Sequence, residues 1–145
     1  MVKIVVYGEP VAQGRPKFFR AKWGVVATDP LKSKNYKEQV RLEGQKIMQK
    51  RGGARLEGAL SLTLDVYKSI PKSWSQKKQK QALESILRPT TKPDLDNYLK
   101  GVQDALSGVV YGDDSYITSV KMNKWYSDKP RIEVTIEEFE LSNNI

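Results

Sequence analysis

Residues 60–67 constrain the fold of this chain more than any other segment. Their sequence, Leu-Ser-Leu-Thr-Leu-Asp-Val-Tyr, places an apolar side chain at alternate positions. Successive side chains of a strand point to opposite faces, so this alternation predicts a strand that is buried on one face only. The chain is therefore expected to contain a sheet with one covered face.

The remaining segments predict the elements around this strand. Further strands are expected at 2–7, 18–20, 25–28, 117–126 and 131–139. Helices are expected at 34–51, from a serine cap at 73 or 75 to about 87, and from a cap at Asp96 to about 107. The resulting order, β-(ββ)-α-β-α-α-β-β, predicts a single α+β domain over residues 1–145, with helices on a mostly antiparallel or mixed sheet. Residues 142–145 are expected to fray.

The chain contains no cysteine and no histidine. This absence excludes disulfides, thiolate zinc sites and cysteine nucleophiles. It equally excludes Ser-His-Asp triads and imidazole metal ligands. Any enzymatic chemistry must rest on carboxylates, lysines, hydroxyls and amides, with or without a hard metal ion.

The charge of the chain predicts a polyanionic partner. It has 25 lysines and arginines against 17 acidic residues, which gives a formal net charge of +8. Such a field attracts nucleic acid, and basic stretches at 13–37 and 66–92 supply most of the candidate contacts. The side chains expected to bind nucleic acid are Arg15, Lys17, Arg20, Lys72, Lys77, Lys78 and Lys92. No apolar run approaches the length of a membrane span, so a cytoplasmic protein without a membrane partner is expected.

Two aspartates and a lysine are expected to share one surface. Pro93 favours an extended chain before it, and an extended 94–96 would project Asp94 and Asp96 to the same side. Lys100 follows Asp96 by one helical turn. These three side chains are the first part of a candidate active site.

A second acidic segment follows the same helix. Asp113 and Asp114 form a tight turn before the strand at 117, and a helix followed by such a turn can return the chain to its sheet. We therefore expect one of the pair to approach Asp94. Clustered carboxylates repel one another unless a cation lies between them, and Mg²⁺ prefers oxygen ligands. Held against a phosphodiester, Mg²⁺ would activate water and stabilise the leaving oxygen.

Each signal also has an ordinary structural interpretation. Asp96 can be a helix cap, Lys100 its ion-pair partner, and Asp113 with Asp114 a plain surface turn. Asp104 is expected to make a surface ion pair. The lysines at 77, 78 and 80 can form a solvated helix face, and the tryptophans at 23, 74 and 125 are expected to pack rather than to stack on bases.

Taken together, the motifs resemble a known nuclease family. They comprise Lys92–Asn97, Lys100, Asp104–Leu106, Val110–Ser115, Gly8–Lys17 and Pro30–Tyr36. This pattern is similar to that of the RusA Holliday-junction resolvases of phages and prophages, and the similarity spans roughly residues 4–139.

The resemblance implies a homodimer that cuts four-way DNA junctions in recombination and repair with Mg²⁺ or Mn²⁺. It implies metal binding by Asp94, Asp96 and Asp114, assistance by Lys100, and a position beside the site for Asp113. Some members carry a basic residue where this chain has Pro93. A twofold dimer would suit the paired nicks that a junction requires. Two alternatives stay open: a nuclease for other branched DNA or for RNA, and a nucleic-acid-binding module without catalysis.

Overall fold

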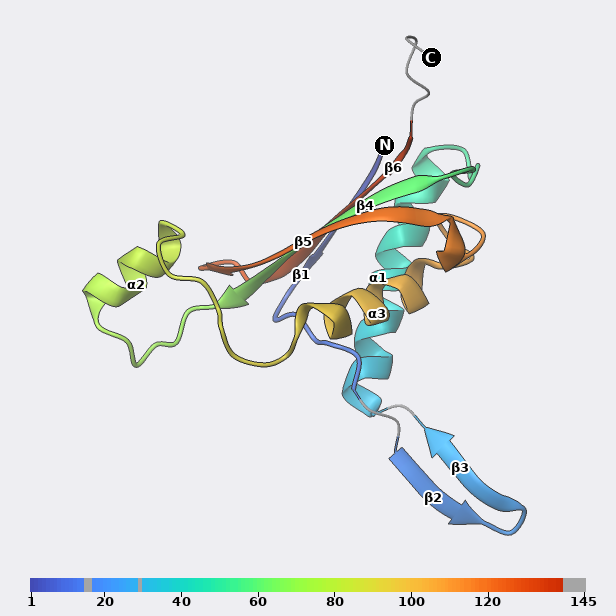
Figure 1. The fold of residues 1–145 in the computed structure, drawn as a ribbon, viewed down its shortest axis with the longest axis horizontal. Helices are drawn as coiled ribbons and strands as arrows, with labels where there is room; N and C mark the ends of the chain where they lie inside the picture. Colours follow the sequence, from blue (N-terminus) through green and yellow to red (C-terminus); the bar gives the residue numbers. More distant parts are fainter. Residues whose placement is uncertain (15–16, 29, 140–145) are drawn as a thin grey trace.

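A computed structural model describes residues 1–14, 17–28 and 30–139, without the side chains of 17, 19 and 26–28 (Figure 1). Its elements are β1 (Val2–Tyr7), β2 (Lys17–Ala21), β3 (Gly24–Thr28), α1 (Leu31–Lys50), β4 (Leu60–Ser69), α2 (Gln76–Leu83), α3 (Leu95–Leu106), the 3-10 turn η1 (Asp114–Tyr116), β5 (Ile117–Ser127) and β6 (Arg131–Glu138). The predicted α+β class and element order are confirmed. The expected fraying of 142–145 lies outside the described residues.

The main sheet has the strand order β1-β6-β4-β5. The pairs β1–β6 and β6–β4 are antiparallel, whereas β4 and β5 are parallel. A parallel pair needs a long crossover, and here α2, α3 and the loops around them supply it. The sheet is therefore mixed, and β5 starts at the same edge of the sheet as β4.

One face of the sheet carries the core, as the alternation at 60–67 predicts. Every second residue of β4 from Leu60 to Val66 has no exposed surface: Leu60, Leu62, Leu64 and Val66. The helices α1 and α3 cover this face (Figure 1). From α3, Tyr98, Val102 and Leu106 pack into the same core.

Two helix boundaries differ from the sequence prediction for local reasons. α1 begins at Leu31 directly after Pro30, three residues earlier than expected. α2 is capped by Ser75, whose Oγ accepts a hydrogen bond of 3.2 Å from Lys78 N, as expected. It ends at Leu83 rather than near 87, because Ser85 adopts a positive φ of 62° that a helix does not accommodate.

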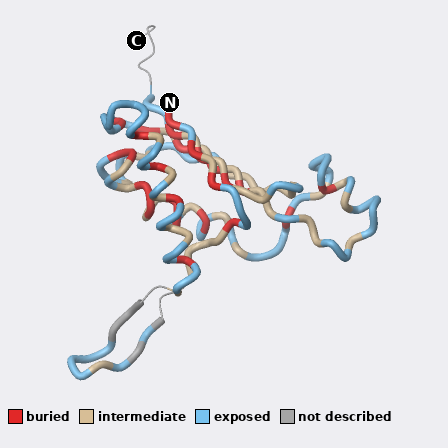
Figure 2. Tube along the Cα trace, turned by 180° about the vertical axis from the view of Figure 1, so that it is seen from behind, coloured by how far each residue is buried: buried red, intermediate tan, exposed pale blue. Residues whose placement is uncertain are grey.

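Two parts of the chain project from this body. The hairpin β2–β3 forms a separate two-stranded sheet on one side, and α2 with its loops extends on another (Figures 1 and 2). The segment leading into α3 lies between them (Figure 1). In the part of the chain that the structure describes, every helix is too short or too polar to form a membrane span.

Candidate active site

The first half of the candidate site is the start of α3. Asp94 is the residue before the helix, with an extended backbone at φ −73° and ψ 154°, and Leu95 is the first helical residue. The predicted cap at Asp96 and the extended 94–96 segment are therefore wrong: Asp96 lies in the first helical turn, because Leu95 packs against the core. The Asp94 side chain makes no capping hydrogen bond, and Asp94, Asp96 and Lys100 are all exposed. Both carboxylates stand where the helix dipole favours negative charge.

Two lysines form hydrogen bonds to the loop that precedes Asp94 and so fix its position. Lys124 Nζ donates to the carbonyl oxygens of Thr91 at 2.9 Å and Pro93 at 3.1 Å. Lys68 Nζ donates to the carbonyl oxygen of Lys92 at 3.2 Å. Three consecutive carbonyl groups before Asp94 are thus held by ammonium groups of β4 and β5.

Sequence reasoning missed these two positioning lysines, although the sequence carried a signal. Lys68 continues the series of core-facing residues that includes Leu64 and Val66, and Lys124 is the register partner of Val66 on β5. Each lysine occupies a position where alternation predicts an apolar residue. Burial, followed by the charge of Lys124, lowers the pKa of Lys68 below its usual value.

The second half of the candidate site surrounds Tyr111. This tyrosine is fully buried, and its hydroxyl donates a hydrogen bond of 2.9 Å to Asp114 Oδ1. Burial, followed by the charge of Asp114, raises the pKa of Tyr111 well above its usual value. Hydrogen bonds from Ser115, including one of 2.9 Å from its backbone N–H, lower the pKa of Asp113.

The two halves do not meet within one chain. Gly108 N donates to Tyr111 O at 2.8 Å, which holds Tyr111 and Asp114 beside the C-terminal end of α3. α3 has 12 residues and is about 18 Å long, and Asp94 stands at its other end. Among the described residues, no three acidic side chains lie close enough together to hold a metal ion. The expectation that Asp114 returns to Asp94 is wrong for a single chain, since β5 runs parallel to β4 and its start lies far from the loop that Lys124 holds.

The expected partner of Lys100 is also different. Lys100 Nζ lies 3.6 Å from Asp104 Oδ1, one turn further along α3, rather than pairing with Asp96. Asp104 Oδ2 also lies 3.7 Å from Lys37 Nζ of α1. The predicted surface ion pair of Asp104 is confirmed, and it leaves Asp96 at the open end of the helix.

The residues predicted to bind DNA divide between the two projections. Lys72, Lys77 and Lys78 are exposed on and before α2, with Lys78 Nζ 4.0 Å from the centre of the Trp74 ring. Arg20 is exposed on β2, and Lys92 is exposed beside Asp94. Arg15 and the side chain of Lys17 lie outside the described residues. The surface around the start of α3 is thus bordered by basic side chains on both sides.

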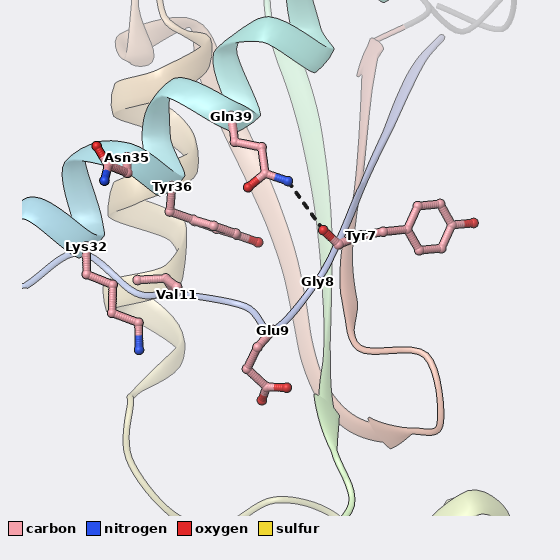
Figure 3. Close-up of a pocket in the computed structure, with 8 residues that line it drawn as sticks. All are labelled: Tyr7, Gly8, Glu9, Val11, Lys32, Asn35, Tyr36 and Gln39. Carbon is pink, nitrogen blue, oxygen red and sulfur yellow. Dashed lines mark hydrogen bonds between the residues drawn. The ribbon is translucent and has the colours of Figure 1, made fainter.

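A small pocket of about 290 Å³ lies between the end of β1 and the start of α1 (Figure 3). Tyr36 and Gln39 line one side, and Gln39 Nε2 donates to Tyr7 O at 3.4 Å. Glu9, another lining residue, accepts a hydrogen bond of 3.4 Å from Ser69 N at the end of β4. None of the predicted site residues lines this pocket, so the candidate chemistry lies on the open surface at α3.

Comparison with known proteins decides the family. The family model described as "Endodeoxyribonuclease RusA" matches residues 7–137, which is most of the chain. The chain belongs to the RusA family. The chain is also similar to the uncharacterized protein YqaN of Bacillus subtilis (strain 168), with 47% identity over 139 residues that cover 94% of this chain and 96% of that protein. The match of the RusA model includes the start of α3, the Tyr111 segment and the projecting hairpin.

Proposed function

We propose that this protein is a Mg²⁺-dependent endodeoxyribonuclease that resolves Holliday junctions by paired symmetric nicks. The observation that carries the proposal is the start of α3. There Asp94, Asp96 and Lys100 are exposed together after a loop that the half-buried Lys68 and Lys124 hold in place, in a chain that matches the RusA model.

The donor set at this position suits a hard divalent cation. Mg²⁺ is typically held by one or two carboxylates, with waters and substrate phosphate oxygens completing its shell. Among the described residues, no capping hydrogen bond or ion pair engages the carboxylates of Asp94 and Asp96. When bound, the metal would polarise the scissile phosphate and lower the pKa of an attacking water. Mn²⁺, which takes the same oxygen ligands, is the expected substitute.

The protein's own side chains have separate parts in this scheme. Asp94 and Asp96 hold the cation, while Lys100 stabilises negative charge that develops on the phosphate in the transition state. Lys68 and Lys124 fix the backbone before Asp94 and thereby its position. The basic side chains of α2 and of the hairpin bind phosphates on either side.

The separation of the two acidic groups supports the proposal of a homodimer. If Asp114 shares a cation with Asp94, a second copy must supply it, because about 18 Å of helix lies between the two groups within one chain. In a twofold dimer each site would then combine Asp94 and Asp96 of one copy with Asp114 of the other. Two such sites suit the twofold symmetry of a four-way junction and the two nicks that its resolution needs.

The test compares the wild type with Asp94→Asn, Asp96→Asn and Asp114→Asn on a four-way junction in Mg²⁺. Each variant should lose cleavage, whereas junction binding should persist or strengthen because repulsion of phosphate falls. Cleavage retained in one variant would contradict the role of that aspartate. A chelator should abolish cleavage by the wild type.

Mixing two inactive variants tests the shared site. A heterodimer of Asp94→Asn and Asp114→Asn contains one site in which both aspartates are intact, if each site draws on both copies. Cleavage should then reappear as single nicks in the mixture. If each site lay within one chain, every site in the mixture would carry a substitution and no nicks would form.

The same cleavage assay distinguishes the alternative functions. Flap, linear duplex and RNA substrates of matched sequence should be cut slowly or not at all relative to the junction. A protein that cuts flaps as well as junctions would be a nuclease for other branched DNA. If Asp94→Asn changes no measured property, the protein is a binding module without catalysis.

A further inference from the structure

The hairpin β2–β3 presents an aromatic tip to solvent. Lys22 and Trp23 form the two-residue connection between Ala21 and Gly24, which are paired in the register. Trp23 is 83% exposed, so the expectation that it packs against the protein is wrong. Figures 1 and 2 view the molecule from opposite sides, and in both the hairpin extends away from the rest of the molecule.

One face of the hairpin combines apolar and basic side chains. Arg20 is opposite Val25 in the register, and Phe18 lies two residues before Arg20, so the three side chains share a face. Phe18 is 69% exposed and Val25 is 68% exposed. A two-stranded hairpin is marginally stable alone, and exposed apolar groups in such a setting indicate a surface that binds a partner.

The charge of the hairpin identifies the chemistry of that partner. Residues 17–28 contain three basic residues and no acidic residue. A second copy of this chain would bring an equally basic arm and a net charge of +8, which opposes contact between arms. Basic side chains interleaved with exposed aromatic rings are instead typical of surfaces that bind unstacked nucleic-acid bases.

The base of the hairpin is fixed beside the candidate active site. Ser33 is buried, and its hydroxyl accepts a hydrogen bond of 2.8 Å from Gly14 N while donating one of 3.2 Å to Ala12 O. Gln13 N donates to Asn97 O at 3.0 Å, one residue after Asp96. The arm therefore starts from the first turn of α3 and extends by about 17 Å, the length of a five-residue strand. This reach equals about five base-pair steps.

We propose that the hairpin reads the branch point of the DNA substrate. Trp23 stacks on a base that is unpaired or unstacked at the branch, and Arg20 and Lys22 contact the phosphates that flank it. An intact duplex offers no free base face to the indole ring, so this contact favours branched DNA over linear DNA. The inference rests on the proposed junction-cleaving function and adds the element that selects the substrate.

The test measures binding to an immobile four-way junction and to a linear duplex of the same sequence, in chelator so that no strand is cut. Three variants separate stacking from other contacts: Trp23→Ala, Trp23→Leu and Trp23→Phe. Loss of one stacked base should weaken junction binding by about 5-fold to 100-fold for the alanine and leucine variants. Trp23→Phe should bind the junction nearly as the wild type does, and all variants should bind the duplex alike. Leu42→Ala, at an exposed apolar residue of α1, is the matched control.

Several outcomes would overturn the inference. One is junction binding by Trp23→Ala that equals the wild type, and another is an equal loss on junction and duplex. Wild-type binding by Trp23→Leu would point to an apolar contact instead of stacking, and dissociation of a dimer by Trp23→Ala would assign the arm to a second copy. If the wild type itself neither prefers nor cuts junctions, the proposed function fails. If the wild type cuts junctions and only the Trp23 variants lack an effect, the failure is confined to the hairpin.

Discussion

The Tyr111 hydroxyl donates a 2.9 Å hydrogen bond to Asp114 Oδ1 from a fully buried ring. Tyr111 is anchored in turn to the end of α3 by its bond with Gly108 N. The position of Asp114 therefore depends on the core of the protein rather than on the surface turn that contains it. This relationship links one predicted metal ligand directly to stability.

Replacing Tyr111 by phenylalanine should lower both stability and cleavage. Hydrogen bonds to charged groups contribute about 1.5–3 kcal/mol, so the free energy of unfolding of Tyr111→Phe should fall by about that amount. Tyr98→Phe is the matched control, because Tyr98 is also buried but its hydroxyl has no hydrogen-bond partner in the described chain. Urea unfolding should show a loss for Tyr111→Phe and none for Tyr98→Phe; equal losses would contradict the assigned bond.

Replacing Lys124 by methionine should slow cleavage far more than it weakens binding. Its ammonium group holds the carbonyl oxygens of Thr91 and Pro93, and displacement of a reacting group by about 1 Å can reduce a rate about 100-fold. Lys121→Met, on the same strand but on the opposite face, removes the same charge and is the control. Single-turnover cleavage and junction binding should be measured for both. Equal rates in the two variants would show that Lys124 acts through charge alone.

Replacing Lys100 by alanine should slow cleavage without destabilising the fold. Its ion pair with Asp104 is exposed and spaced i,i+4, which contributes only about 0.3–0.5 kcal/mol. Loss of a group that stabilises transition-state charge typically reduces the rate about 100-fold or more. Lys46→Ala, which breaks the exposed pair with Glu43, is the control and should leave cleavage unchanged. A thermal melt alongside the cleavage assay separates the two effects, and a Lys100→Ala enzyme as fast as the control would remove Lys100 from the site.

Alkaline pH should unfold this protein steeply. Burial is the main cause that raises the pKa of Tyr98 to about 12, and it raises those of Tyr36 and Tyr111 further. The unfolded chain loses these protons near the ordinary value of 10.0 while the folded chain retains them, so stability is full below pH 10 and falls as the pH rises above it. If unfolding releases three protons, the free energy of unfolding falls by about 4 kcal/mol per pH unit. Urea unfolding between pH 9 and 12, at about half-unit steps, should show this slope, and Tyr98→Phe should reduce it by about one third; an unchanged slope would contradict the burial of that phenol.

Local patterns in the sequence predicted most of the elements and selected the residue types of the candidate site. The alternation at 60–67 predicted β4, and the prediction of a serine cap at 73 or 75 placed the start of α2, which the structure shows directly after Ser75. The absence of cysteine and histidine restricted any enzymatic chemistry to carboxylates, lysines, hydroxyls and amides, and the aspartates around α3 marked the candidate carboxylates. These features depend on the side-chain period of a strand, on capping and on residue chemistry, all of which act over a few neighbouring residues.

Tertiary structure alone decided which of these residues lie together. The parallel pairing of β4 with β5 separates Asp114 from Asp94 by the length of α3, and no spacing in the sequence fixes that direction. The same pairing brings Lys68 and Lys124 to the loop before Asp94. The hydrogen bond of Lys68 to Lys92 spans 24 positions of sequence, and that of Lys124 to Pro93 spans 31. The exposure of Trp23 is likewise a property of the fold, because a tryptophan at a turn is buried only where another part of the chain packs against it. Local physics sets the elements, whereas strand pairing and packing between distant segments set the distances on which a site depends.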